Sequence, residues 1–341
     1  MRKLATIQKI KEILPIQGAD AIELAIVNGW KVVVGKNVGH KVGDSVVYCE
    51  IDSFLPLKEE FEFLRKTSYK KMSDGSEGFR LKTIKLRGQV SQGLIIPIDV
   101  LLKYGICEDD VYEGLDVSGM LGIIKYEPPI PAELSGTAKG LFPGFISKTD
   151  EERVQNLTEE YKEWVKSGKR FYVTEKLDGS SATFYYKDGE FGVCSRNLEL
   201  LETEGNTFWR VARELDLENK MRDFGVNISL QGELIGEGIQ GNPYKIKGQT
   251  VRFFNLFDID LHQYHSFHMF EPIVKSQFGL ETVPILDKNF TLPETIEEIL
   301  SYADAKSELN PNFDREGVVI RSMDRKISFK VISNKFLLNE K

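Results

Sequence analysis

A stretch rich in proline and glycine, YEPPIPAELSGTAKGLFPGF, occupies residues 126–145 of this chain. It shows no apolar periodicity, which is typical of a linker or an extended crossing segment. Because 341 residues are too many for one ordinary compact core, a domain is expected on each side of it. We therefore predict domains at residues 1–125 and 149–341, with a connecting segment at residues 126–148.

The first domain is predicted to be a small β-barrel. Short runs of β-branched residues alternate with glycine-containing turns in residues 30–56 and again in residues 78–98, and only residues 99–104 look helical. Several short strands with regular turn signals favour an OB-like barrel, whose face and loops commonly hold oligonucleotides.

A local basic segment within this domain is compatible with nucleic-acid binding. The net charge of −7 argues against a global field that attracts nucleic acid, but it leaves room for a basic surface. Residues 64–89 are rich in lysine and arginine, with Tyr69 and Phe79 interleaved. Cations for phosphates and aromatic rings for bases suit nucleic acid, although a solvated loop has the same composition. The predicted contacts are Lys70, Lys71, Lys82 and Lys85.

Several protein classes are disfavoured by composition. The apolar runs are too short to span a membrane, and the N-terminus lacks a signal-peptide pattern, so a soluble intracellular protein is expected. Widely spaced cysteines give neither a disulfide framework nor a zinc signature. These are Cys49, Cys107 and Cys194. The HQYHSFH stretch at residues 262–268 is interpreted as a polar loop or helix end rather than a metal site.

The second domain is predicted to be a mostly antiparallel α+β domain, because strands outnumber helices. A helix is expected over residues 149–168, capped by Thr149 or Asp150. Residues 171–175 and 182–187 are expected to form a hairpin-like pair. Further helices are predicted at residues 206–221 and 293–307, and further strands at residues 229–236, 251–260, 316–321 and 326–333.

Lys176 lies between two strand-like runs, in FYVTEKLDGSSATFYY. A lysine inside an alternating apolar run costs desolvation unless something offsets it. One interpretation is a surface lysine at a hairpin turn, because Asp-Gly is a strong turn signal. The other is a nucleophile presented beside a tight turn.

Five short pieces of the second half each end a strand-like run with a charged or small residue. They are EKLDG (175–179), CSRN (194–197), GELIG (232–236), REGVVIR (315–321) and SFK (328–330), with the aromatic strand FFNLFDI (253–259) among them. In this order they resemble the motifs of the covalent nucleotidyltransferases, which comprise ATP-dependent ligases and mRNA capping enzymes. The chain is most similar to RNA ligases that carry an OB module before an ATP-grasp-like catalytic domain.

The resemblance implies a covalent chemistry at Lys176. This lysine would attack the α-phosphate of ATP, become lysyl-AMP and release pyrophosphate. Lys330 matches the lysine that neutralises the α-phosphate in the transition state, and Arg196 matches an arginine that contacts ribose or phosphate. Glu233 matches a glutamate near the ribose and the metal.

The resemblance also implies the rest of the nucleotide and metal site. Phe257 matches the aromatic residue that stacks on adenine, Glu175 joins the nucleotide-binding set, and Arg153 reaches the β- or γ-phosphate. The residues implied to bind Mg²⁺ or Mn²⁺ through water are Asp178, Glu233 and Glu316. Taken singly, Phe257 also fits a core residue and the charged residues fit exposed strand ends. Their joint order favours the site.

A lysine nucleophile must lose its proton, since a free lysine has a pKa of about 10.4. Burial, a nearby cation or a metal ion favours the neutral amine. The candidate cations are Arg196, Lys330 and bound Mg²⁺, whereas Asp178 favours the ammonium. One departure from related ligases is Ile332, where a second lysine is often found; Lys335 is the possible substitute.

The predicted function is therefore that of an ATP-dependent RNA ligase joining 3′-OH and 5′-phosphate ends, in RNA repair. The predicted partner is RNA, as a nicked duplex, with no membrane, and a monomer is expected. Alternatives are a DNA ligase, a GTP-dependent capping enzyme, or a non-catalytic OB-fold RNA-binding protein. Preferred labelling by GTP, sealing of an all-DNA nick, or RNA binding without AMP transfer would indicate them.

Overall fold

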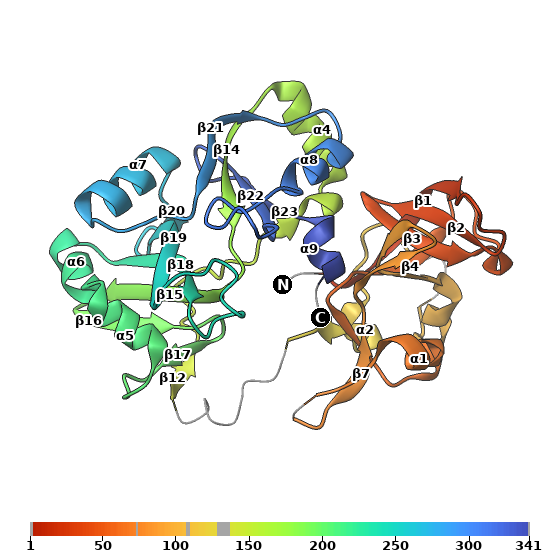
Figure 1. Ribbon diagram of the computed structural model, residues 1–341. Helices are drawn as coiled ribbons and strands as arrows, with labels where there is room; N and C mark the ends of the chain where they lie inside the picture. Colours follow the sequence, from red (N-terminus) through yellow and green to blue (C-terminus); the bar gives the residue numbers. More distant parts are fainter. Residues whose placement is uncertain (1–2, 73, 107–109, 128–136, 340–341) are drawn as a thin grey trace. The chain divides into compact units, whose positions relative to one another are not determined.

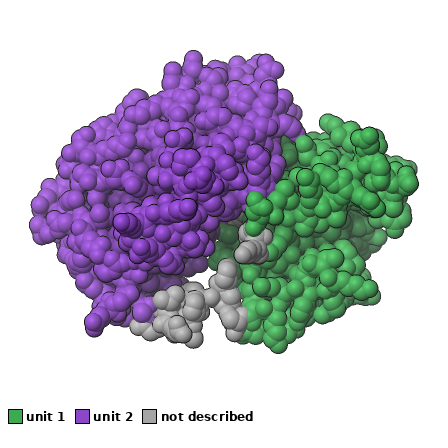
Figure 2. All heavy atoms as spheres, in the orientation of Figure 1, with its two compact units in different colours: residues 1–130, 154–159, 337–341 green, residues 131–153, 160–336 purple. Residues whose placement is uncertain are grey.

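The computed structural model describes residues 3–72, 74–106, 110–127 and 137–339 (Figure 1). The chain divides into two compact units (Figure 2). Unit 1 comprises residues 1–130, 154–159 and 337–341, and unit 2 comprises residues 131–153 and 160–336. The domain boundaries predicted at residues 125 and 149 stay predictions. Cys107 and residues 128–136 of the predicted connecting segment lie outside the described residues.

Unit 1 has the strand order of an OB-like half-barrel, as its sequence predicts. Its main sheet is antiparallel and runs in the order β10 (Leu94–Pro97), β4 (Ser45–Cys49), β1 (Ala5–Pro15), β2 (Ile22–Val27) and β3 (Trp30–Gly35). A second sheet runs in the order β11 (Ile124–Lys125), β5 (Ser53–Pro56), β7 (Glu77–Arg80) and β6 (Tyr69–Lys71). A separate hairpin joins β8 (Thr83–Leu86) and β9 (Gln89–Gln92).

The strands of unit 1 form because alternate apolar residues can face a common core. Ile7, Val47, Leu55 and Phe79 come from four different strands and are all fully buried in one cluster. The short helices are η1 (Lys36–Val38), η2 (Glu59–Leu64), α1 (Arg65–Ser68), η3 (Ile98–Tyr104) and α2 (Ser118–Leu121). The helix predicted at residues 99–104 is therefore present, as the 3-10 helix η3.

Unit 2 is built on two mostly antiparallel sheets, which confirms the predicted α+β class. The strand order in the larger sheet is β12 (Ala138–Leu141), β17 (Leu198–Leu200), β16 (Glu190–Cys194), β15 (Ser180–Lys187), β18 (Ile228–Gly236), β19 (Gln249–Asp258) and β20 (Gln263–Tyr264). The strand order in the smaller sheet is β13 (Glu152–Arg153), β23 (Ser328–Ile332), β22 (Gly317–Ser322), β14 (Arg170–Lys176) and β21 (Ile285–Thr291). In the smaller sheet β13 and β23 pair in parallel.

Helices and aromatic residues cover the outer faces of these sheets. Trp209 and Phe267 pack with Phe184 and Phe253 of the larger sheet in the main core cluster. The helices of unit 2 are α5 (Thr207–Glu214), α6 (Leu217–Phe224), α7 (Phe267–Pro272), η6 (Ile273–Gln277) and α8 (Ile296–Ala303). Three more lie at unit boundaries: η5 (Val154–Asn156) begins at one, and α4 (Thr158–Ser167) and α9 (Asn334–Asn339) each run across one.

The predicted hairpin around Lys176 is wrong. β14 pairs with β21 and β22, whereas β15 pairs with β16 and β18, so the two strands belong to different sheets. The Leu177–Gly179 turn therefore carries the chain from one sheet to the other. Sequence alone favours the hairpin because an Asp-Gly turn is the same locally in both arrangements.

The predicted helix over residues 149–168 starts later than expected. The helix α4 begins at Thr158, because Glu152 and Arg153 form a parallel strand beside Phe329 and Lys330. The apolar face of α4 still packs as expected. Trp164 stacks on Phe329 with their ring centroids 5.4 Å apart.

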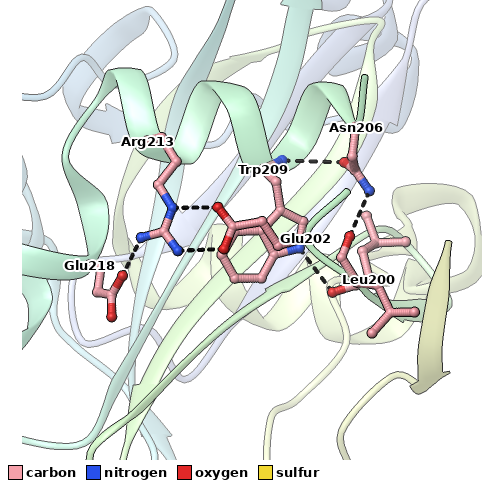
Figure 3. A network of polar contacts seen from close by, with 7 residues as sticks. Leu200, Glu202, Asn206, Trp209, Arg213 and Glu218 are labelled. Carbon is pink, nitrogen blue, oxygen red and sulfur yellow. Dashed lines mark hydrogen bonds and ion pairs between the residues drawn. The ribbon is translucent and has the colours of Figure 1, made fainter. Parts of the chain in front are cut away.

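The helix predicted over residues 206–221 is divided into α5 and α6 at Asp216, which has a left-handed φ of 54°. Asn206 caps α5 by accepting hydrogen bonds from the backbone N–H groups of Phe208 and Trp209. Figure 3 shows how the two helices are tied to β17 and the segment after it. The Trp209 indole donates to the Leu200 carbonyl, and the Arg213 guanidinium contacts Glu202 and Glu218.

Candidate active site

Lys176 lies at the last position of β14, where the chain leaves the smaller sheet. Its neighbour across the ladder is Gly317, so Glu316 approaches the lysine from the start of β22. The Lys176 ammonium and the Glu316 carboxylate are 2.7 Å apart, and their side chains are 28% and 16% exposed. The lysine is therefore paired and largely withdrawn from solvent, not a free surface residue.

Two glycines allow the close approach of backbone that forms this site. A Cβ on Gly317 would lie 2.2 Å from the Val331 carbonyl oxygen, and one on Gly179 would lie 2.5 Å from the Leu234 carbonyl oxygen. No real side chain fits at such distances. Gly179 thereby brings the turn after Lys176 against β18, the strand that carries Glu233.

Three carboxylates surround Lys176 and determine its charge. Burial lowers the pKa of the Lys176 ammonium, but Glu316, Glu233 and Asp178 outweigh burial and raise the pKa above its ordinary value. Burial raises the pKa of Glu233 to about 8; Glu316 and Asp178 add to this rise, whereas Lys176 and Arg196 oppose it. Without additional cations, the lysine is therefore an ammonium among three carboxylates.

Lys330 and Arg196 meet at a carboxylate that sequence reasoning assigned to a helix cap. Asp150 places one carboxylate oxygen 3.7 Å from the Lys330 ammonium and 3.7 Å from the Arg196 guanidinium. Lys330 is opposite Val319 of β22 and beside Arg153 of β13. The strand β13 thus brings the TDEER segment to Lys330, which the predicted helix would not have done.

Lys176 and Lys330 share the inner face of the smaller sheet. Side chains alternate along β14 and β23, so Phe171 and Phe329 point to the opposite face, where they contact Trp164. Arg153 is buried at 4% exposure next to Lys330. The structure therefore brings Lys176, Lys330 and Arg153 together in one sheet.

Glu175 and Phe257 occupy more enclosed positions than the other predicted residues. Glu175 is on the face of β14 opposite Lys176, and its carboxylate accepts a hydrogen bond from the Glu308 backbone N–H at 2.8 Å. Burial raises its pKa. Phe257 is 1% exposed and packs edge-to-face on Tyr264 at 5.0 Å. Their nucleotide-binding roles stay predictions.

The three acids fit a divalent cation held through water better than one bound directly. In the described part of the chain, no three histidine, cysteine or acidic side chains are grouped closely enough to hold a metal ion. The raised pKa of Glu233 comes first from burial, and the neighbouring carboxylates of Glu316 and Asp178 add to it. Hard oxygen donors with excess negative charge are what Mg²⁺ and Mn²⁺ prefer.

Ile332 stands where related ligases often have a second lysine, and Lys335 is the candidate substitute for that lysine. Ile332 is buried at 4% exposure in β23, and Lys335 is an exposed residue of α9. The backbone N–H of Lys335 donates to the Asp304 carboxylate at 3.5 Å.

The predicted nucleic-acid contacts all lie in unit 1. Lys70 and Lys85 are exposed, on β6 and β8. Lys71 is also exposed but forms an ion pair with Glu77 at 2.9 Å, and Lys82 is half-buried. Their role in RNA binding stays a prediction.

Sequence reasoning missed Tyr244 as well as Asp150. The Asp178 backbone N–H donates to the Tyr244 hydroxyl at 2.6 Å. The sequence gives one indication of a role for Tyr244. This tyrosine lies in the glycine-rich stretch GEGIQGNPYKIKG, whose apolar residues follow neither a strand nor a helix period.

Comparisons with known proteins agree with this architecture. A family model described as an OB-fold domain matches residues 4–98, and one described as RNA ligase matches residues 169–333. The comparison with curated proteins gives no match. In the described part of the chain, no helix combines the length and apolar character needed to cross a membrane.

Solved structures of an RNA ligase from Naegleria gruberi are similar to this chain over its whole length. A glutamate-to-alanine variant with AMP and Mn is 46% identical, with a TM-score of 0.92 and 99% of each chain covered. The ligase with PPi is 46% identical, with a TM-score of 0.90, covering 99% of this chain and 98% of that one. A lysine-to-alanine variant with ATP and Mn is 45% identical, with a TM-score of 0.90 and 99% of each covered.

Proposed function

Because this chain belongs to the RNA ligase family, we propose that it uses ATP to join RNA strands ending in a 3′-OH and a 5′-phosphate, in RNA repair. The observation that carries the proposal is the Lys176 amine, 2.7 Å from Glu316 and within the influence of Glu233 and Asp178. A half-buried lysine held among acids at a junction of two sheets is a perturbed group of the kind found at functional sites.

ATP is proposed as the nucleotide, because the similar Naegleria ligase was solved with ATP and Mn and with AMP and Mn. In the first step the Lys176 nitrogen bonds to the α-phosphorus, and the bond from that phosphorus to the pyrophosphate oxygen breaks. Glu316 accepts a hydrogen bond from the Lys176 ammonium, so the proton leaves along this contact. Lys330 and Arg196 balance the negative charge that develops on the phosphate.

The Asp150 carboxylate holds these two cations until the nucleotide arrives. Because its oxygen lies 3.7 Å from each of them, the α-phosphate must compete with it for Lys330 and Arg196. Arg153, beside Lys330, is proposed to reach the β- or γ-phosphate. Glu233 is proposed to lie near the ribose, with Phe257 stacked on adenine and Glu175 completing the nucleotide set.

Asp178, Glu233 and Glu316 would hold Mg²⁺ or Mn²⁺ through water. A divalent cation supplies positive charge to the reacting phosphate and offsets the carboxylates that keep Lys176 protonated. In the metal's presence these three side chains orient water, and Lys176 moves toward its neutral, nucleophilic form.

The later steps transfer AMP and seal the strands. The 5′-phosphate oxygen of RNA attacks the lysyl-AMP phosphorus, so the Lys176–phosphorus bond breaks and a pyrophosphate linkage forms. The 3′-OH oxygen then attacks the activated 5′-phosphorus and releases AMP. Catalysis by the protein is mainly positioning and charge stabilisation, as in phosphoryl transfer generally.

The two predicted domains would divide these tasks. We propose that the OB-fold domain at residues 1–125 holds the RNA, as a nicked duplex, through Lys70, Lys71, Lys82 and Lys85. The domain at residues 149–341 carries the chemistry. The protein is proposed to act inside the cell as a monomer.

The test is a two-stage labelling experiment. The protein is incubated with α-labelled ATP and Mg²⁺ or Mn²⁺, and is then given a nicked RNA duplex or an all-DNA duplex of the same sequence. We expect label on the protein first and then sealing of the RNA nick. Labelling by GTP in preference to ATP, or sealing of the DNA nick alone, would overturn the proposal. RNA binding with no AMP transfer would indicate a non-catalytic protein.

A further inference from the structure

A strap at residues 237–248 joins β18 to β19 and holds the turn that follows Lys176. Its backbone is unusual, because Gln240, Asn242 and Lys245 all have left-handed φ values, of 46°, 50° and 54°. Such conformations are uncommon for residues other than glycine and persist where surrounding contacts fix them. The strap is therefore shaped by its contacts, not by local preference.

Tyr244 is the buried anchor of the strap. It is 3% exposed and packs in a cluster with Leu177 and Ile235, and its ring contacts Phe313 edge-to-face at 5.8 Å. Leu177 is the residue between Lys176 and Asp178. The cluster that contains Tyr244 therefore also packs against the first residue of the Leu177–Gly179 turn.

The Tyr244 hydroxyl also accepts a hydrogen bond from the Asp178 backbone N–H, with the two atoms 2.6 Å apart. A second contact supports the same turn, since the Gln240 amide donates to the Gly179 carbonyl at 3.3 Å. From the other side, the Asn310 amide donates to the Pro243 carbonyl at 2.7 Å and holds the strap in place. The Asp178 N–H and the Gly179 carbonyl, one on each side of the turn, are therefore both bonded to the strap.

We propose that Tyr244 is a positioning residue for the lysine nucleophile, acting through the backbone of Asp178 to fix that carboxylate and the Lys176 amine relative to each other. This inference rests on the proposed function and adds a residue to it. Fixing the turn matters because small displacements of reacting groups cost large factors in rate. Tyr244 itself contacts the turn.

The first test compares two tyrosine-to-phenylalanine substitutions. Tyr244→Phe removes the hydroxyl that holds Asp178 and keeps the ring. Tyr161→Phe is the matched control. Tyr161 lies on α4, is 1% exposed, and donates a hydrogen bond from its hydroxyl to the Pro293 carbonyl at 2.9 Å. We expect Tyr244→Phe to lower the single-turnover rate of lysine adenylylation about tenfold with the KM for ATP unchanged. Tyr161→Phe should leave both unchanged.

The second test asks whether Tyr244 acts through Asp178. In a double-mutant cycle, the effect of Tyr244→Phe should shrink to less than about twofold in an Asp178→Asn background, because the orienting contact then has no charge to place. Gln240→Ala, at an exposed position, removes the companion bond and should lower the rate in the same direction without loss of folding.

Three results would overturn the inference. They are a rate for Tyr244→Phe equal to that of Tyr161→Phe, a change confined to KM, and effects of Tyr244→Phe and Asp178→Asn that multiply independently. If Tyr244→Phe does not fold, an unchanged rate for Gln240→Ala has the same meaning. Each of these requires a wild-type protein that acquires AMP, so failure here is distinct from failure of the proposed function.

Discussion

Glu233 faces the carboxylates of Glu316 and Asp178, with Lys176 and Arg196 as opposing cations. Burial is the main cause of its raised pKa, and the two neighbouring carboxylates add to it, whereas an ordinary glutamate is ionised well below neutral pH. The same acids raise the pKa of Lys176. These carboxylates stabilise the Lys176 ammonium, so a neutral amine requires another positive charge near them. A metal ion that binds together with the nucleotide would supply that charge.

This charge balance predicts how stability depends on pH. The pKa of Glu233 rises from 4.5 to about 8 on folding, so between these values the folded state holds a proton that the unfolded state has lost. The free energy of unfolding should therefore fall as pH rises through that window, by roughly 1–3 kcal/mol. Urea denaturation with a chelator present, at pH 5 and pH 8, measures it.

Glu233→Gln should remove most of this dependence, because the amide does not titrate. Glu237→Gln, at an exposed position in the strap, is the control and should keep it. Equal pH dependence in the two variants would show that Glu233 does not carry the effect.

The proposed role of Lys330 is to balance the charge that develops on the α-phosphate. Lys330→Met should lower the rate of lysine adenylylation by about 100-fold or more, because one preorganised cation at developing charge is worth that much. Lys326→Met is the control, since Lys326 is exposed in the turn before the same strand. Single-turnover labelling with ATP measures both, and equal rates would rule out a role for Lys330 in charge stabilisation.

Motif residues could be predicted from sequence, whereas their supporting partners could not. Lys176, Glu233 and Glu316 follow from short pieces in a fixed order, and the structure brings them together. Asp150 and Tyr244 have no such signal. From sequence, Asp150 is predicted to be a helix cap, and only the pairing of β13 with β23 places it beside Lys330. Tyr244 contacts the backbone of Asp178, and no rule of sequence spacing predicts such a contact.

Among the elements, strands with strong apolar runs were predicted well. β18, β19, β22 and β23 lie within a few residues of their expected positions, because each carries several apolar residues that are buried in the structure. Pairing was harder. The hairpin at Lys176 and the early start of α4 were both wrong because distant strands, β22 and β23, compete successfully with local preference.

The close packing of β22 on β23 predicts the effect of a single added methyl group. Gly317→Ala places a Cβ 2.2 Å from the Val331 carbonyl oxygen, so the two strands must separate beside Glu316. We expect a loss of about 1–3 kcal/mol in the free energy of unfolding. Gly144→Ala, where nothing lies within 4 Å, should be close to neutral. Equal denaturation midpoints would contradict the required close approach.

At the scale of the whole molecule, the chain combines an OB-fold unit with a ligase unit, as its sequence predicts. Each unit buries its own core, which composition and length could indicate. The grouping of residues 154–159 and 337–339 with unit 1 could not be predicted, because it depends on tertiary contacts of short segments.

The proposed division of labour between the units predicts separable defects. Lys70→Glu with Lys85→Glu should leave lysine adenylylation unchanged but weaken RNA binding and nick sealing, and should reduce the salt dependence of binding. Lys36→Glu with Lys41→Glu makes the same charge change at exposed positions outside residues 64–89. Filter binding and nick sealing at several salt concentrations measure this. Equal behaviour of the two pairs would mean that the basic segment is only solvated loop.

The identity of the nucleophile is tested most directly by mapping the nucleotide adduct. The wild-type protein is incubated with ATP and Mn²⁺, digested, and examined by tandem mass spectrometry alongside Lys176→Met. We predict AMP joined through a phosphoramidate to the side chain of Lys176, and no adduct on the variant. AMP found on another residue, or an equal amount of adduct on Lys176→Met, would contradict this account.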